Sequence, residues 1–195
     1  MTTTITRLYD SYNDAEYVVR QLEAAGFRDA DVSVVASNRD NWYETREPTA
    51  GEDANTGAGI GAVIGGGVGL LTGLGIIAIP GVGPVVAAGW LVSLVAGAAA
   101  GGVIGGGAGG LIGAMTASGV PERDAHVYAE GVRRGGTMVV ARVDDARRVE
   151  AERIMDQRTY VDPAARRAEY EREGWKSFNP DVPADPRDPS FRERV

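Results

Sequence analysis

The sequence predicts an α+β protein: a small ferredoxin-like α/β sandwich, interrupted by a long glycine-rich helical hairpin and followed by an extended C-terminal tail. Strand and helix patterns alternate in two separated stretches of the 195 residues. Between them lie 68 residues, 54–121, without Asp, Glu, Lys or Arg, and the end of the chain holds five of the nine prolines. We therefore expect a split α/β domain at 1–50 and 117–158, a hairpin at 51–116 and a tail at 159–195.

The beginning of the chain has the pattern of a β-α-β unit. Residues 5–9 (Ile-Thr-Arg-Leu-Tyr) alternate apolar and polar side chains, as a half-buried strand does. A helix is expected next, with Asn13 and Glu16 as a capping pair at its start and Gly26 as its stop. A second strand is expected over residues 31–36.

The same kind of pattern resumes after the uncharged block. Pro121 fits the first turn of a helix, and the glycines at 135–136 end that helix. Residues 137–143 (Thr-Met-Val-Val-Ala-Arg-Val) form the clearest strand pattern in the chain, and Asp144 or Asp145 can cap a last helix. Neither half can bury its apolar faces alone, so the two halves should pack as one sheet covered by helices.

Small residues recur at every fourth position of the uncharged block. Residues four apart share one face of a helix, so such a series makes a smooth surface for close helix packing. The first series lies in residues 57–79 and the second in residues 85–115, with a tight turn at 80–84 between them. The helix-packing residues expected from this spacing are Gly57, Gly61, Gly65, Gly69, Gly73, Gly89, Ser93, Gly97, Gly101, Gly105, Gly109 and Gly113.

Two environments for this hairpin stay open. A helix of the 23 residues 57–79 would be about 35 Å long, enough to span a hydrocarbon core of about 30 Å. Glycine costs about 1 kcal/mol relative to alanine in a helix in water, which favours a bilayer. In the alternative, the hairpins pack in the dry centre of a cytoplasmic homo-oligomer. In either environment the glycine faces join the two helices of one hairpin or also neighbouring subunits.

The composition argues against catalysis, cofactors and nucleic acid. The chain has no cysteine, and its one histidine, His126, lies beside Glu122 and Asp124 early in a helix, a pattern more typical of a surface helix residue than of a metal ligand. The glycine-rich block lacks the Lys-Ser/Thr pair of a phosphate-binding loop, and a net charge of −7 without a basic face disfavours nucleic acid. We therefore expect no enzyme activity, no catalytic or metal-binding residue, no cofactor and no small-molecule substrate. The expected partners are other copies of the chain and membrane lipid.

The tail contains two aromatic residues in a polar, proline-rich setting. Residues 164–173 are expected to form a short charged helix, and Trp175 and Phe178 follow it. These two side chains are the candidate docking residues, for their own domain, a neighbouring subunit or another protein. A solvated tail is the alternative.

Both α/β stretches resemble the domain of the bacterial heat-induced general stress proteins. The motifs that carry the resemblance are Leu8-Tyr-Asp10, Asp14-Ala15, Leu22-Glu-Ala-Ala-Gly-Phe27, Val35-Ala-Ser-Asn38 and the stretch from Gly119 to Gly136. The resemblance covers residues 4–158, supplies no catalytic motif and implies a stress-associated, membrane-attached protein. The start of the chain lacks the basic and apolar regions of a secretory signal. We therefore expect a non-enzymatic protein of the bacterial cytoplasmic membrane, with both termini cytoplasmic, that self-assembles through its glycine-zipper hairpin.

Overall fold

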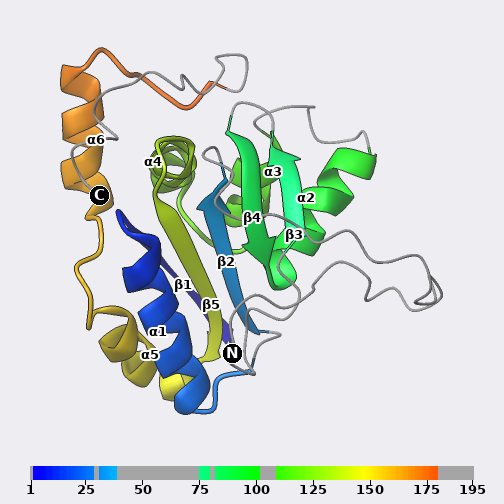
Figure 1. Cartoon of the computed structure of the whole chain (residues 1–195), viewed down its shortest axis with the longest axis vertical. Coiled ribbons are helices and arrows are strands. Elements are labelled where there is room, and N and C mark those ends of the chain that lie inside the picture. The colour runs from blue at the N-terminus through cyan, green and yellow to red at the C-terminus, as the bar shows by residue number, and fades with distance from the viewer. Residues whose placement is uncertain (1, 29–30, 39–74, 80–81, 102–108, 180–195) are drawn as a thin grey trace.

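The fold is an antiparallel sheet with helices on both of its faces, shown as a computed structural model in Figure 1. The structure describes residues 2–28, 31–38, 75–79, 82–101 and 109–179. Its elements are β1 (Thr2–Tyr9), α1 (Tyr12–Ala24), β2 (Val32–Ser37), β3 (Gly75–Ile79), β4 (Gly83–Ala88), α2 (Trp90–Gly101), α3 (Gly109–Ala117), α4 (Glu122–Arg133), β5 (Thr137–Asp144), the 3-10 turn η2 (Asp145–Arg147), α5 (Arg148–Met155) and α6 (Pro163–Arg172).

The sheet joins the two separated halves of the α/β domain, and the mixed α/β class is confirmed. The strand order is β1-β5-β2-β4-β3, and each strand runs antiparallel to its neighbours. β5 lies between β1 and β2, with Ile5 opposite Ala141 and Val34 opposite Val139. A ferredoxin-like arrangement, with the element order β-α-β-β-α-β, is not confirmed, because the described residues between β2 and β5 form two strands and three helices.

The strands bury both faces, so the described core has two main parts, beside a small third cluster of Val86 and Ala88. Side chains alternate between the faces of a strand. In β5, Val139 and Ala141 belong to the cluster formed with α1 and α5, whereas Met138 and Val140 belong to the cluster formed with α2, α3 and α4. α1 and α5 therefore cover one face side by side, and the α2–α4 helices cover the other (Figure 1).

The predicted hairpin of two long helices is not confirmed: α2 and most of α3 lie in the second expected helix, but strands occupy other parts of both expected helices. Residues 75–79 and 85–88, expected in helices, form β3 and most of β4, and β4 pairs with β2. The turn between β3 and β4 includes a bond from the Val82 N–H to the Ile79 carbonyl of 3.0 Å. Consecutive β-branched residues favour strands, and here they outweigh the helical spacing of the glycines.

The remaining packing residues fall into three groups. Gly89 is not on a helix face, because it precedes α2 with a φ of +90°. Ser93, Gly97 and Gly101 lie in α2, and Gly109 and Gly113 lie in α3. The others lie outside the described residues: Gly57, Gly61, Gly65, Gly69, Gly73 and Gly105. Within the described residues no helix is both long and apolar enough to cross a membrane.

Two helix starts also differ from the prediction. α1 begins at Tyr12 after Ser11, so Asn13 and Glu16 do not form the capping pair. The residue before α5 is Arg147, because the chain first makes the η2 turn after Asp144. α1 does end just before Gly26, and the short helix expected in the tail is α6.

Candidate functional site

The start of α2 is held against β2 by three contacts. The Leu91 N–H donates to the Ser33 hydroxyl at 3.0 Å, so a side chain of the sheet satisfies a free amide at the helix N-terminus. The Trp90 indole N–H donates to the Asp31 carbonyl at 3.3 Å. A Cβ at Gly89 would lie 2.2 Å from the Val32 carbonyl oxygen, so the chain passes β2 more closely than any other residue allows. The position of α2 is therefore fixed by the sheet.

An arginine of β5 covers the same tryptophan. The guanidinium carbon of Arg142 lies 4.3 Å from the centroid of the Trp90 ring, and its Nη2 is 3.7 Å from the Asp31 carboxylate. Cation–π contacts of this kind stabilise by roughly 0.5–2 kcal/mol. The uncharged segment is thus joined to the charged α/β domain through a contact at the first residue of α2.

α2 has a buried side and an exposed side, although no residue on it is charged. Leu91 and Val95 are buried among α3 and the sheet, and the Cβ of an alanine at position 110 would contact Val95 at 3.7 Å. Ser93 and Leu94 are exposed, Leu94 to 44%. An uncharged helix of apolar residues is typical of a buried position, so its exposed side is the candidate packing surface of the molecule.

The second candidate surface lies where the tail meets the domain. We call residues 159–179 the C-terminal strap. The Val161 N–H donates to the Leu8 carbonyl of β1 at 2.7 Å, and the Val161 side chain is buried in the core. The Asp162 carboxylate then accepts from the Ala165 N–H at 2.7 Å and caps α6, which begins with Pro163.

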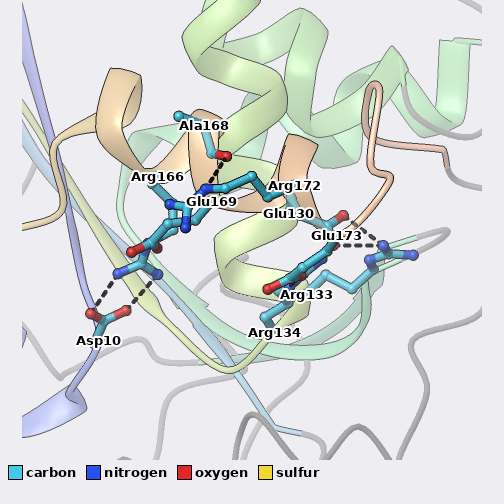
Figure 2. Close-up of polar contacts among 9 residues, drawn as sticks. All are labelled: Asp10, Glu130, Arg133, Arg134, Arg166, Ala168, Glu169, Arg172 and Glu173. Atoms are coloured by element: carbon cyan, nitrogen blue, oxygen red, sulfur yellow. Dashed lines mark hydrogen bonds and ion pairs between the residues drawn. The ribbon is translucent and has the colours of Figure 1, made fainter.

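An ion pair between distant parts of the sequence holds the start of α6 (Figure 2). The Arg166 guanidinium donates two hydrogen bonds to the Asp10 carboxylate, of 2.9 and 2.7 Å, and lies 3.0 Å from Glu169. Burial lowers the pKa of Arg166, but its bonds to Asp10 and the nearby charges outweigh burial and raise it. The bidentate geometry makes this pair more specific than a simple contact of opposite charges.

A buried carboxylate lies at the other end of this contact. Glu130 on α4 is fully buried, and its oxygens are 2.6 Å from Arg133 and 2.7 Å from Arg134. Arg134 also pairs with Glu173, just after α6 (Figure 2). Arg134 therefore lies between two carboxylates, Glu130 of α4 and Glu173 of the strap. Burial lowers the pKa of Arg134, and the bonds to both carboxylates outweigh it, so the pKa is raised.

Aromatic side chains complete the docking of the strap. Phe178 is buried in the core cluster, and Trp175 packs against that cluster. Tyr170 is buried too, with its ring centroid 5.5 Å from that of Trp175. The guanidinium carbon of Arg134 lies 4.1 Å above Tyr170, and that of Arg133 lies 5.7 Å from Phe178. The structure thus places both candidate docking residues of the tail against their own domain.

The charged and aromatic contacts described above hold the strap against the domain. Within the residues that the structure describes, no cluster of three or more His, Asp or Glu side chains could hold a metal ion. His126 lies 4.0 Å from Glu122, one turn earlier on the exposed end of α4. The Asp10–Arg166 and Arg134–Glu173 pairs each join the strap to the domain, and Arg133 and Arg134 neutralise the buried Glu130.

Sequence reasoning missed the residues that organise the second surface. Glu130, Arg133 and Arg134 have the spacing of helix neighbours, a signal that was available in the sequence. The pairing of Asp10 with Arg166 had no such signal, since the two residues are 156 positions apart.

Comparison with protein-family models, with curated proteins and with solved structures gave no match. The resemblance to the heat-induced general stress proteins therefore depends on the quoted sequence motifs and stays a prediction.

Proposed function

We propose that the protein is a non-enzymatic, stress-associated scaffold that assembles with other copies of itself through its uncharged segment. The observation that supports this proposal best is α2, an uncharged helix that is anchored to β2 and exposes Leu94. The stress association follows from the sequence resemblance alone.

The chemistry of α2 favours a second copy as the partner. Its exposed side offers no charge for recognition of a charged ligand, whereas the small exposed side chain of Ser93 allows another helix to approach closely. Burying a leucine side chain contributes about 1.5–3 kcal/mol, and a two-fold interface uses each such contact twice. Self-association thus removes the exposed apolar surface that a monomer leaves in water.

The position of β3 and β4 favours an assembly over a bilayer-inserted hairpin. The membrane version places residues 80–84 at the far end of two long helices. In the structure, the strands on either side of these residues belong to the sheet of the α/β domain. The glycine-zipper packing that we propose between copies therefore involves α2 and α3.

Native mass measured with and without detergent tests this proposal. We expect one discrete assembly without detergent, and we expect Leu94→Lys to reduce it to monomers, because the new charge would be buried in the interface. Val149→Lys is the matched control, since Val149 is an apolar side chain of α5 that is 76% exposed, and its assembly should stay unchanged.

Two results would overturn the proposal. One is a monomer at every concentration of the wild-type chain. The other is flotation with lipid vesicles after alkaline extraction, together with a need for detergent, which would support the bilayer-inserted hairpin instead. Circular dichroism of Leu94→Lys distinguishes a lost interface from a lost fold.

A further inference from the structure

The C-terminal strap is joined to the domain by an exposed connection. Residues 156–158, between α5 and the strap, and the first two residues of the strap are all exposed, and burial resumes at Val161. Arg158 lies 3.7 Å from Asp14, and the Arg7 guanidinium carbon lies 4.5 Å above the Tyr160 ring, so the contacts of this connection are on the surface. A segment that is anchored by its own contacts and linked to the domain by exposed residues is suited to domain swapping, the exchange of an identical element between two copies.

The surface under the strap is complementary to it in charge and in shape. Asp10 lies at one end of the contact and receives Arg166, while Arg134 lies at the other end and receives Glu173. Val161 and Phe178 enter the core on either side of α6. The outer surface of α4 and the end of β1 thus form a receptor for this one segment, which we call the strap site.

We propose that the strap site is also an interface between copies of the chain: the strap of one copy binds the strap site of a second copy, and the second strap binds the first. Every contact made within one chain is made again in the exchanged pair, so exchange requires no new complementary surface. Its extent is set by the local concentration of a chain's own strap relative to the concentration of other chains.

This proposal does not rest on assembly through α2, because the strap site lies on α4 and β1. Its charges also give it a signature of its own. Asp10→Arg places two arginines together at the Asp10–Arg166 contact, and Arg166→Asp places two carboxylates there. Each variant therefore weakens its own strap contact, but a mixture of the two restores opposite charges at both sites of an exchanged pair.

Native mass spectrometry of the mixed variants tests the proposal. We expect heterodimers of Asp10→Arg with Arg166→Asp to exceed their statistical share, half of all dimers, by outnumbering homodimers at least about fivefold, equivalent to about 1 kcal/mol. The control is the double variant Asp10→Arg/Arg166→Asp mixed with wild type. Each of these chains has opposite charges at positions 10 and 166, so each can form the ion pair with a strap of its own kind. Heterodimers of the two chains should therefore stay at or below the statistical share.

A statistical share of heterodimers in the first mixture, or no dimers, would overturn strap exchange even if assembly through α2 occurs. A second measurement needs no variant of the protein. A fluorescent peptide of residues 159–179 should bind the wild-type chain at one peptide per chain and displace its own strap, and an Arg166→Asp peptide should bind at least about tenfold more weakly. Absence of peptide binding after prolonged incubation would also contradict the proposal.

Discussion

The backbone of Gly89 lies against the carbonyl group of Val32. A Cβ at Gly89 would be 2.2 Å from that oxygen and 2.5 Å from the Ser33 hydroxyl, and the residue has a φ of +90°. This contact lets β4 pair with β2 and then start α2 without a longer loop. Two conditions, the positive φ and the close approach, therefore require glycine at a position where the spacing of small residues predicted helix packing.

The first prediction separates these two conditions. Gly89→Ala should lower the free energy of unfolding by about 3 kcal/mol, because the alanine would adopt a strained positive φ and its Cβ would clash with a carbonyl oxygen. Gly119→Ala is the matched control: its φ is +95°, but no described atom lies within 4 Å of the added Cβ. It should cost only about 1–2 kcal/mol. Urea denaturation of both variants measures the difference, and equal losses would contradict the role of the Val32 contact.

The second prediction concerns the buried charge of α4. Glu130→Gln should destabilise the protein by about 3 kcal/mol, because Arg133 and Arg134 then lose the carboxylate that neutralises them in a buried position. Glu173→Gln should cost less than about 1 kcal/mol, since the Glu173 side chain is 52% exposed. Thermal and urea unfolding measure both losses. A loss from Glu173→Gln as large as that from Glu130→Gln would show that burial does not decide the strength of this contact.

The third prediction concerns the anchor of the strap. Phe178→Ala should increase amide hydrogen exchange in α6 about 100-fold, because removing a buried phenylalanine costs about 3 kcal/mol and releases the strap locally. Lys176→Ala changes an exposed neighbour and should leave the exchange rates as they are. Exchange in α1, on the other face of the sheet, should not change in either variant. Unchanged exchange in α6 of Phe178→Ala would mean that other contacts hold the strap.

The fourth prediction is a loss of stability at alkaline pH. Burial, followed by the nearby Asp124, raises the pKa of Tyr128 to about 12. Below a pH of about 10 the phenol is neutral in both the folded and the unfolded chain, and the stabilisation is complete. Between about 10 and 12 only the unfolded chain loses its proton, so this stabilisation, about 2–3 kcal/mol, is lost as pH rises.

Comparison with Tyr128→Phe isolates this contribution. The free energy of unfolding of wild type should fall more steeply from pH 10 to 12 than that of the variant, by the same 2–3 kcal/mol. Measurements at pH 8 give the reference for the packing change itself. Parallel pH profiles for the two proteins would show that Tyr128 does not carry the effect.

The first and last strands of the α/β domain could be predicted from their local patterns. Residues 5–9 alternate between apolar and polar side chains, residues 137–143 contain a run of apolar residues rich in valine, and both segments form strands that pair as β1 and β5. β3 and β4 could not be predicted from such patterns, since the residues around them are all uncharged and most of them are apolar. In such a segment the two-residue period of a strand cannot be distinguished from the four-residue spacing of a helix face. Only the branched side chains, such as those of Ile76 and Val86, favour strands.

The candidate surfaces, too, could be predicted only in part from the sequence. The aromatic residues of the tail indicated docking, but the partner surface depended on contacts between residues far apart in the sequence, such as Asp10 with Arg166. The burial of Glu130 could not be predicted from α4 alone, because α6 and the residues after it cover that side of the helix.

The position of β5 in the sheet determines when the sheet can form during synthesis of the chain. β1 and β2 are joined through β5, and β5 begins only at residue 137. A growing chain therefore carries β1, β2 and the whole uncharged segment before it contains the strand that unites them. Apolar surface exposed during synthesis promotes aggregation, so a growing chain carries this risk until β5 is made. Pairing of strands far apart in sequence also slows folding, so this chain should fold more slowly than a protein whose neighbouring strands are adjacent in sequence.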